Sequence, residues 1–436
     1  MKLLIIKDNQ HNSKDDFYEV KSIVERVADK TFLQLEKEGI FIFPELVKDS
    51  NDLTKDQMIL KSRNENYVST NVMGVIGYGD EQLVIESRFS EGENDFFSQY
   101  LLEKVLDFTN FVNLNTSINQ DIRTLNYLLF LFTHYLKNAS RKGAFKTYIK
   151  NEYNDMHVRG SIDIARHIKK NTPFIGNISY NQREYSFDNY MMELIRHTIE
   201  FIKSKPYGYK ILNTVKNEIK LIIDLTPKYR AIDRQSIIEI NKNKPIHHAY
   251  YHEYKDLQKI CLMILQNQKH QFGIGNHKMY GILFDGSWLW EEYLNLLLEH
   301  LFYHPMNKSK VGEQKLFSHN IGAIYPDFIG KEKDNKIIAD AKYKPMDKIG
   351  NKDYLQLLAY MFRFDSKKGY YMYPDSKGTN DLQLVLNSGT TYENNVSERN
   401  DIIVIKHGLK IPTHCITYNE FVSKIHDSEK DFLASL

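Results

Sequence analysis

The stretch from residue 324 to 344 constrains the fold more than any other part of the sequence. It reads IYPDFIGKEKDNKIIADAKYK, two short apolar runs joined by a charged turn, which predicts a β-hairpin. With the turn centred in KEKDNK, Asp327 and Asp340 lie equally far from it and face each other across the antiparallel pair. Opposed residues have β-carbons about 4.5–5.5 Å apart, and like charges there destabilise the pair. Lys342 follows Asp340 by two residues and therefore projects from the same face.

A divalent cation would resolve the conflict between the two carboxylates. Hard oxygen ligands suit Mg²⁺ or Mn²⁺, so Asp327 and Asp340 are candidate metal ligands. Such an ion polarises a phosphoryl oxygen and generates hydroxide. Lys342 is then a candidate for positioning or deprotonating the attacking water, or for neutralising charge in the transition state. The alternative is an ordinary Pro-Asp turn, with Asp340 and Lys342 forming an exposed salt bridge. The hairpin alone leaves both interpretations open.

Two helical patterns flank the hairpin and supply further polar side chains. Upstream, SWLWEEYLNLLLEHLF places Glu291 among tryptophans and leucines, where its carboxylate is a candidate metal ligand. A solvated first-turn glutamate, favoured by the helix dipole, is the alternative. Downstream, DYLQLLAYMFRF puts Gln356 and Tyr360 on one helix face, where they could touch a substrate phosphate or orient water. We take Gln356 as a candidate catalytic residue and Tyr360 as a candidate nucleic-acid contact, although the polar rim of a core helix would look the same.

The order of expected elements indicates several domains. At 436 residues the chain is long for one domain. Residues 1–110 mix short strands and turns, including a β-hairpin in NVMGVIGYGDEQLVIESRF. Residues 111–275 carry the apolar spacing of helices. Residues 276–436 alternate strands with helices, the latter expected at 287–303 and 351–364, which is typical of an α/β domain. We therefore expect an α/β (α+β) multidomain protein with a β-rich N-terminal region and a helical middle region.

Composition is that of an ordinary soluble protein. The hydrophobic content is 42% and the formal net charge is only +2, so charge alone does not indicate a nucleic-acid binder. Two cysteines, Cys261 and Cys415, lie far apart, which excludes a disulfide framework and suits a reducing cytosol. The start, MKLLIIKDNQ, favours a β-strand over a signal peptide. No apolar run approaches the roughly 20 residues that cross a bilayer. We expect a cytoplasmic protein with no membrane contact.

A segment of the middle region combines basic and aromatic residues. RKGAFKTYIK and HVRGSIDIARHIKK contain Lys142, Lys146 and Arg159, which are candidate nucleic-acid contacts. Basic residues with interleaved aromatics can follow a phosphate backbone. Contact with a partner protein and a solvated helical face remain equally good explanations.

Other chemistries find little support in the sequence. His248 and His252 have the spacing that holds zinc on a helix, but they lack the glutamate of H-E-x-x-H and a nearby third ligand. Structural histidines are therefore the favoured interpretation. The chain contains no G-x-x-x-x-G-K-[ST] motif and no G-x-S-x-G elbow. We expect that it binds no nucleotide and that a partner handles any nucleotide chemistry.

The order of the motifs around the hairpin resembles the PD-(D/E)XK nuclease superfamily. The similar features are a helix with Glu291, the YPD at 325–327, the DAKYK at 340–344 and a helix with Gln356. The resemblance implies a mixed sheet flanked by helices. It also implies that Asp327, Asp340 and Lys342 occupy the motif positions of an endonuclease domain over residues 276–436.

A wider resemblance covers residues from about 70 to 365. GVIGYGDEQLVIESRF, KGAFKTYI with HVRGSIDIARHI, YSFDNYMMELIRHTI and LWEEY together resemble McrC. McrC is the nuclease subunit of McrBC modified-cytosine restriction systems, and LlaJI-type subunits belong to the same group. The resemblance implies a phage-defence protein that cuts double-stranded DNA with Mg²⁺ or Mn²⁺. It also implies that residues 1–110 dock on a hexameric, McrB-like AAA+ GTPase or NTPase and stimulate it. A methyltransferase is a further candidate partner.

Two alternative functions stay open at this point. In the first, the chain is an adaptor that assembles and activates the NTPase through a degenerate nuclease site. The intact Asp327, Asp340 and Lys342 argue against it. In the second, the chain is a self-sufficient type II restriction or repair nuclease, which would cut DNA without partner or nucleotide.

Overall fold

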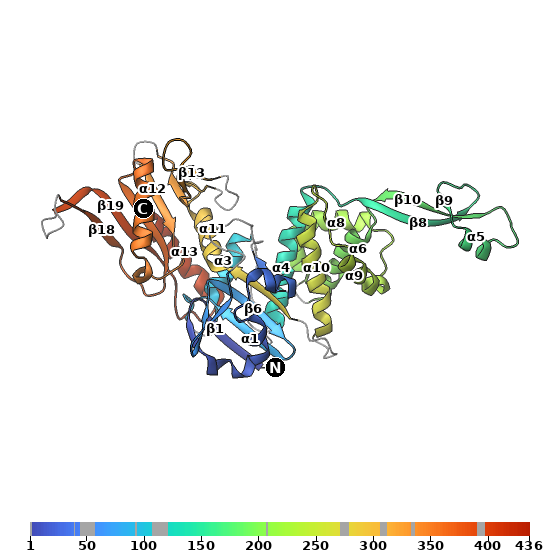
Figure 1. Ribbon diagram of the computed structural model, residues 1–436, viewed down its shortest axis with the longest axis horizontal. Coiled ribbons are helices and arrows are strands. Elements are labelled where there is room, and N and C mark those ends of the chain that lie inside the picture. Colours follow the sequence, from blue (N-terminus) through green and yellow to red (C-terminus); the bar gives the residue numbers. More distant parts are fainter. Residues whose placement is uncertain are drawn as a thin grey trace. The chain divides into compact units, whose positions relative to one another are not determined.

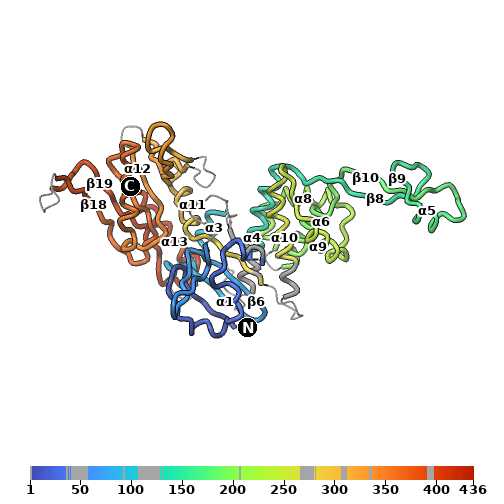
Figure 2. The backbone as a smooth tube through the Cα atoms, in the orientation of Figure 1, coloured from blue at the N-terminus to red at the C-terminus, as the bar shows by residue number. Residues whose placement is uncertain are grey.

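The computed structural model describes residues 2–38, 40–43, 57–91, 94–106, 121–205, 208–270, 279–305, 312–332, 336–389 and 397–436. Contacts divide the chain into two compact units. Figures 1 and 2 show the chain coloured by residue number, from blue at the N-terminus to red at the C-terminus. Unit 1 combines residues 1–118 with residues 275–436, and unit 2 consists of residues 119–274. Among the described residues, no helix is both long and apolar enough to span a membrane.

A five-stranded sheet forms the N-terminal part of unit 1. In spatial order its strands are β1 (Lys2–Lys7), β7 (Glu81–Glu86), β6 (Val72–Tyr78), β11 (Tyr280–Asp285) and β3 (Ile40–Phe43). β1 is the N-terminal strand that the sequence predicts, and it pairs parallel to β7. β6 and β7 form the predicted hairpin, closed by a tight turn at Gly79 and Asp80. Gly79 has a φ of +62°, which glycine adopts without steric cost.

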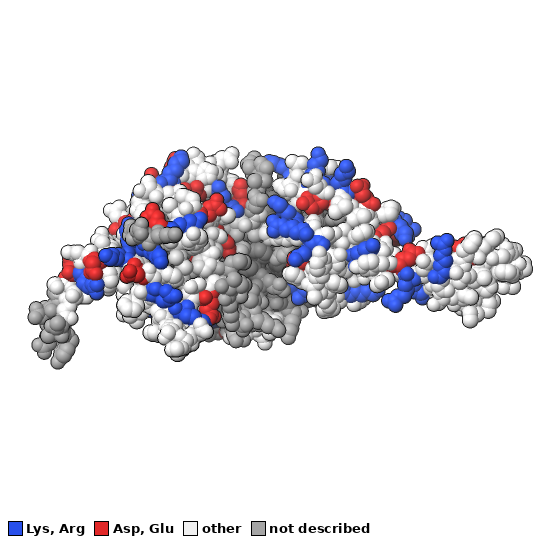
Figure 3. Space-filling model, turned by 90° about the horizontal axis from the view of Figure 1, so that it is seen from above, with Lys and Arg blue, Asp and Glu red and all other residues white. Residues whose placement is uncertain are grey.

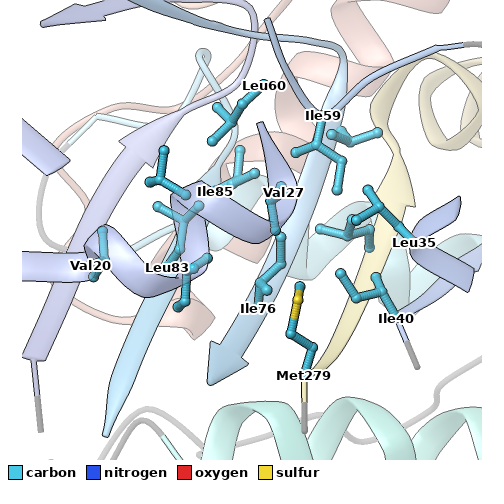
Figure 4. Close-up of a cluster of buried hydrophobic side chains, with 14 of the residues drawn as sticks. Val20, Val27, Leu35, Ile40, Ile59, Leu60, Ile76, Leu83, Ile85 and Met279 are labelled. Atoms are coloured by element: carbon cyan, nitrogen blue, oxygen red, sulfur yellow. The ribbon is translucent and has the colours of Figure 1, made fainter. Parts of the chain in front are cut away.

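Short helical segments cover this sheet and complete its core. They are the 3₁₀ helix η1 (Lys14–Val20), α1 (Lys21–Val27) and α2 (Phe32–Glu38). Val20 and Val27 pack with Ile76 and Leu83 of the sheet in a buried apolar cluster (Figure 4). The sequence interpretation expected only strands and turns here, because seven-residue helices are too short for the helical apolar spacing to repeat. A separate small sheet consists of β2 (His11–Ser13), β5 (Asn66–Ser69) and β4 (Leu60–Arg63).

Strand β11 joins regions that the sequence interpretation assigned to different domains. It falls within the expected endonuclease region 276–436, yet it lies between β6 and β3 in the N-terminal sheet. Gly74 permits the close approach, since a β-carbon there would lie 2.0 Å from the carbonyl oxygen of Ile282. Residues 1–110 and 276–436 therefore contribute to one compact unit instead of two. Pairing between strands so far apart in the chain leaves no local signal in the sequence.

The C-terminal part of unit 1 contains a mixed sheet, as the resemblance implies, and this sheet has six strands. In spatial order the strands are β12 (Phe302–Tyr303), β15 (Phe328–Gly330), β16 (Ile337–Ala341), β17 (Lys368–Asp375), β19 (Ser397–Lys410) and β18 (Leu382–Ser388). β16, β17 and β19 run parallel, and the outer pairs are antiparallel. Two short strands, β13 (Gln314–Lys315) and β14 (Ala323–Ile324), pair with each other.

Helix α12 (Asn351–Phe364) has the bounds that the sequence predicts and packs on this sheet. Its Leu357 and Met361 lie in one buried cluster with Ile338 of β16 and Tyr371 of β17. Because Asp340 follows Ile338 by two residues, its side chain lies on the face that α12 covers.

Three further helices pack together in unit 1. They are α3 (Phe96–Val105), α11 (Gly286–Leu298) and α13 (Tyr418–Ala434). The hydroxyl groups of Tyr100 in α3 and Tyr293 in α11 both donate to Glu429 of α13, each over 2.6 Å. Helix α11 ends earlier than the predicted helix 287–303. Phe302 and Tyr303 form strand β12 instead, because pairing with β15 stabilises the extended backbone.

Unit 2 is helical, as predicted, except for residues 147–186. Its helices are α4 (Asp121–Ser140), α6 (Tyr190–Lys203), α7 (Gly208–Leu212), α8 (Lys216–Leu225), α9 (Arg234–Asn243) and α10 (Glu253–His270). The remaining elements are β8 (Thr147–Asp155), β9 (Ser161–Ile162), α5 (Ile164–Lys170) and β10 (Ile178–Ser186). β8 and β10 extend away from the helices of this unit and carry β9 and α5 at their far end (Figure 1). We call residues 156–175 the hairpin end.

Candidate functional site

The β15–β16 hairpin opposes the two aspartates as the sequence predicts. Phe328 pairs with Ala339 and Ile329 pairs with Ile338, so the next position of the same register sets Asp327 against Asp340. The Oδ2 atom of Asp327 accepts a hydrogen bond of 2.9 Å from the backbone N–H of Ala341, next to Asp340. We call these two residues the aspartate pair.

The aspartate pair is buried, and negatively charged side chains surround it. Asp340 is only 1% exposed. Burial raises the pKa of Asp327 well above its ordinary value, and the negative charges of Asp340 and Glu291 add to the effect. Burial also raises the pKa of Asp340, although the ammonium group of Lys342 acts in the opposite direction. Without a further cation, the site therefore disfavours two ionised carboxylates.

Lys342 supplies the positive charge beside the aspartate pair. Its Nζ atom lies 2.5 Å from Oδ2 of Asp340 and 3.9 Å from Oδ1 of Asp353. Burial disfavours the charged form of Lys342, but the negative charges of Asp340 and Asp327 outweigh burial and raise its pKa above the ordinary value. The surroundings of Lys342 therefore favour its charged form.

Asp353 belongs to the site but was missed in the sequence. It lies in the first turn of α12, where its Oδ2 accepts hydrogen bonds from Nζ of Lys344 at 2.7 Å and the backbone N–H of Gly350 at 2.9 Å. Despite burial, these bonds hold the pKa of Asp353 below its ordinary value. The signal that could have found it is an acidic residue three positions after the glycine preceding a helix, which is the spacing of an N-terminal cap.

Glu291 lies near the aspartate pair, in helix α11, and close to a histidine that was also missed. Its Oε1 atom is 3.6 Å from Nε2 of His304. The other ring nitrogen of His304, Nδ1, lies 2.9 Å from the backbone oxygen of Asp327. Glu291 contributes negative charge to the site, but the described residues contain no group of three or more His, Cys, Asp and Glu side chains arranged to hold a metal.

The aspartate pair on its own fits a Mg²⁺ ion. This ion commonly binds one or two carboxylates and completes its shell with water and substrate phosphate. Oδ2 of Asp340 is buried and receives no hydrogen bond of normal geometry, although the Lys342 ammonium group lies close to it. A buried carboxylate oxygen with spare acceptor capacity matches the oxygen ligands that Mg²⁺ and Mn²⁺ prefer.

Gln356 and Tyr360 meet on α12 as their spacing predicts. The Nε2 atom of Gln356 donates to the Tyr360 hydroxyl over 2.7 Å. Burial raises the pKa of Tyr360, and the negative charges of Asp340 and Asp327 act in the same direction. Tyr360 is 5% exposed, so only a small part of it faces solvent.

The basic candidates lie in unit 2, on different elements. Lys142 follows α4 and lies 3.9 Å from Glu253. Lys146 precedes β8, with its ammonium group 4.8 Å from the centre of the Tyr185 ring. Arg159 is exposed between β8 and β9. Of the three explanations left open, a single helical face does not hold for these residues, because the segment consists of β8, β9 and the short helix α5. On the face in Figure 3, Lys and Arg are interspersed with Asp and Glu instead of forming a continuous basic track.

The two histidines considered for zinc are not on a helix. His248 and His252 lie in the turn before α10, which begins at Glu253. The Nδ1 atom of His248 accepts a hydrogen bond of 3.2 Å from the backbone N–H of Tyr250. The favoured structural interpretation of these histidines agrees with these positions.

The hairpin and its sheet have the arrangement that the sequence resemblance leads us to expect. A hairpin with two opposed aspartates and a following lysine lies in a mixed sheet that helices flank. Asp327, Asp340 and Lys342 are the residues that the resemblance to the PD-(D/E)XK superfamily assigns to the motif positions. The chain belongs to the McrBC family. The family profile described as "McrBC 5-methylcytosine restriction system component" matches residues 68–374, which is more than half of the chain.

Solved structures of archaeal McrBC complexes are similar to this chain at low sequence identity. One is a chain of a half-complex of Thermococcus gammatolerans McrB AAA+ hexamers with bound McrC. It is 13% identical with a TM-score of 0.47, over 98% of this chain and 99% of that chain. A second, from the Thermococcus gammatolerans McrBC complex, is 12% identical with a TM-score of 0.32, over 70% of this chain and 90% of that chain. No curated protein matches the chain.

Proposed function

We propose that this chain is the Mg²⁺-dependent DNA endonuclease subunit of an NTP-dependent restriction system of the McrBC or LlaJI kind. The observation that carries the proposal is the aspartate pair, buried and opposed in the β15–β16 hairpin with the Lys342 ammonium group beside it. Two carboxylates in this arrangement are destabilising by themselves. A cation bound between the two carboxylates would offset their repulsion and could also bind the phosphodiester of the substrate.

Asp327 and Asp340 would hold the metal ion. When bound, Mg²⁺ or Mn²⁺ supplies Lewis-acid polarisation of the scissile phosphate and acidifies a bound water. Glu291 stays close enough to add negative charge at the site. Glu291 would add a third carboxylate beside the ion, and its contact with His304 would hold that carboxylate in place.

Lys342 acts as a cation in the proposed reaction. Its pKa is raised above the ordinary value, so donation of hydrogen bonds is favoured over deprotonation of water. The Nζ group would donate to a non-bridging phosphate oxygen, where negative charge increases in the transition state. Asp340 and Asp353 fix its position from two sides.

Gln356 and Tyr360 would orient the attacking water. Gln356 donates through Nε2 to Tyr360, so its Oε1 atom is available in this proposal to accept from water. Lys142, Lys146 and Arg159 remain candidates for contact with double-stranded DNA, since each carries a charge that can neutralise a phosphate.

The proposed partner is a hexameric AAA+ GTPase or NTPase, in line with the McrB hexamers named in the similar Thermococcus complex. We propose that the hairpin end of unit 2 supplies contacts to it, in addition to the docking expected for residues 1–110. The exposed apolar side chains there are Met156, Val158, Ile162, Ile164, Ile168, Phe174 and Ile175. On the face in Figure 3 this end carries almost no charged side chains. Several exposed apolar side chains on one segment support an interaction site there, although the same segment also exposes the charged side chains of Arg159, Lys169 and Lys170.

The proposal is tested by cleavage of DNA in the presence of the partner NTPase, nucleotide and Mg²⁺. We expect Asp340→Ala to lose cleavage while it still binds the partner and stimulates NTP hydrolysis. Full cleavage by this variant would remove the nuclease assignment. Rapid cutting by the purified wild-type chain without partner or nucleotide would favour the self-sufficient nuclease instead. An inactive wild-type chain that still stimulates the NTPase would favour the adaptor.

A further inference from the structure

We propose that Arg88 is a positioning residue that holds Lys342 and Glu291 in place, a role that rests on the nuclease function proposed above. Arg88 follows strand β7 in the N-terminal sheet, whereas Lys342 and Glu291 belong to the C-terminal part of unit 1. In this proposal the first part of the chain controls the geometry of a site that the last part of the chain forms.

Arg88 is itself fixed by Asp8. The Nη2 and Nε atoms of Arg88 lie 2.6 and 3.1 Å from Oδ2 of Asp8, and the backbone N–H of Arg88 donates to Oδ1 over 2.6 Å. The side chains of Arg88 and Asp8 are 7% and 0% exposed. A two-pronged bond to a buried carboxylate fixes the plane of the guanidinium group as well as its position.

The first connection from Arg88 runs to the residue after Lys342. The guanidinium carbon lies 4.9 Å from the centre of the Tyr343 ring, and the Tyr343 hydroxyl is 2.7 Å from Oγ of Ser87. The Phe89 ring contacts Tyr343 edge-on, with centroids 5.0 Å apart. Tyr343 is thus clamped by three consecutive residues of the N-terminal part, and the backbone of Lys342 is fixed next to it.

The second connection runs to the start of α11, the helix that carries Glu291. Nη2 of Arg88 also donates to Oδ1 of Asn71. The backbone oxygen of Asn71 accepts from the N–H of Gly286 over 2.8 Å, and its side chain reaches Oγ of Ser287 at 3.3 Å. The same guanidinium group therefore contacts residues that set both Lys342 and α11.

The two connections meet again inside the site. The carbonyl oxygen of Met372 accepts hydrogen bonds from the backbone N–H of Lys342 at 2.9 Å and from Nε1 of Trp290 at 3.1 Å. Trp290 immediately precedes Glu291. Tyr343 also packs against Gly286 so closely that a β-carbon at Gly286 would lie 2.7 Å from its ring. A shift of Tyr343 would therefore disturb both catalytic elements.

A cavity lies beside Arg88 and Phe89, the two residues whose side chains contact the Tyr343 ring. Its volume is about 410 Å³, and its lining includes Asn9, Gln10, Arg88, residues 345–348 and residues 373–377. Residues 345–348, which follow Lys344, border this open space together with Arg88. Small displacements of catalytic groups cost on the order of 10²-fold in rate.

The test substitutes Arg88 by lysine in the full chain. Lysine keeps the charge next to Asp8 but cannot form the fork or stack in the same plane. Arg26→Lys is the matched control, because Arg26 of α1 also stacks on a tyrosine. Its guanidinium carbon lies 4.1 Å from the ring of Tyr78, which belongs to strand β6 of the N-terminal sheet. Neither residue contacts Tyr343 or Lys342 in the contacts described above. With partner, nucleotide and Mg²⁺ present, we expect Arg88→Lys to lower kcat for DNA cleavage on the order of 10²-fold, with KM and NTPase stimulation unchanged. Wild-type kcat in Arg88→Lys, or an equal fall in Arg26→Lys, would overturn the inference.

A second measurement does not depend on nuclease activity. Hydrogen exchange of the Lys342 and Gly286 amides, both hydrogen-bonded in this network, should become faster by about tenfold or more in Arg88→Lys and stay unchanged in Arg26→Lys. Unchanged exchange in Arg88→Lys would contradict the positioning role even if the chain proves not to cut DNA. Failure of the wild-type chain to cut DNA with faster exchange in Arg88→Lys would contradict only the proposed function.

Discussion

Lys342 and Lys344 lie two residues apart, but their ammonium groups have different neighbours. Nζ of Lys342 lies 2.5 Å from Asp340, whereas Nζ of Lys344 lies 2.7 Å from Asp353. Only the first contacts the aspartate pair directly. We predict that Lys342→Met lowers the rate of DNA cleavage on the order of 10²- to 10³-fold, the usual loss for one electrostatic contact to the transition state.

Lys344→Met is the matched control for that variant, because it removes the same charge from the same strand end. Single-turnover cleavage by the two variants should differ clearly, with Lys344→Met close to wild type. Equal losses in both would mean that net positive charge matters and that the position of Lys342 does not.

His197 in α6 gives a prediction about stability in unit 2. Its side chain is fully buried, and both ring nitrogens are without a hydrogen-bond partner. Burial lowers the pKa of His197 to about 4, and the positive charge of Arg234 adds to the effect. The unfolded chain, with a histidine pKa of about 6.5, takes up a proton more readily as pH falls below that value. Stability should therefore be full above that pH and decrease as pH falls toward 4.

The size of the His197 effect follows from the two pKa values. Between pH 7.5 and 5, protonation of the unfolded state should lower the free energy of unfolding by about 2 kcal/mol. Other groups also titrate in this range, so the quantity to measure is the difference between wild type and His197→Gln in urea unfolding. A pH dependence identical in the two chains would show that His197 does not contribute.

At the scale of elements, the hairpin end of unit 2 is the most testable surface. Ile168 and Phe174 are 61% and 63% exposed, and they lie among other exposed apolar side chains. We predict that Ile168→Asp with Phe174→Asp abolishes stimulation of the partner NTPase, because charge at the centre of an apolar interface is not compensated. Ile232→Asp, at an 85% exposed isoleucine of the same unit, should leave stimulation unchanged. Retained stimulation in the double variant would contradict the interface.

Some elements could be predicted from the sequence because their information is local. The register of β15 and β16 follows from the apolar alternation around Asp327 and Asp340, and the structure confirms it. Helix α12 has both predicted bounds, and Gln356 contacts Tyr360 as its spacing requires. The two-residue period of strands and the four-residue spacing of helices determine these contacts. Each contact involves only one or two neighbouring elements.

Other elements could not be predicted because distant residues decide them. Phe302 is in a strand instead of the predicted helix, since it pairs with Gly330. β11 completes a sheet whose other strands all lie within the first 86 residues. Asp353 and His304 were missed because only the folded chain brings them to Lys342 and Glu291.

At the scale of the whole molecule, the first and last parts of the chain share unit 1, and the site depends on both. The contacts of Arg88, Asn71 and Tyr343 connect the N-terminal sheet to the segment after β16 and to α11. If residues 1–110 contact the partner as expected, the part of the chain that binds the NTPase also contains Arg88. Arg88 in turn contacts Tyr343, the residue after Lys342. Partner binding and DNA cleavage would then be physically connected within one unit.

The central claim is that the aspartate pair holds the metal ion for DNA cleavage. The most direct test is the single-turnover cleavage rate across a Mg²⁺ titration, with partner and nucleotide present, for wild type and Asp327→Asn. Asparagine keeps the shape of the side chain but removes the charge that binds the cation. We predict that the wild-type rate rises with Mg²⁺ to a plateau, while Asp327→Asn stays at background at every concentration. A wild-type plateau in Asp327→Asn, or wild-type cleavage without any divalent cation, would contradict the claim.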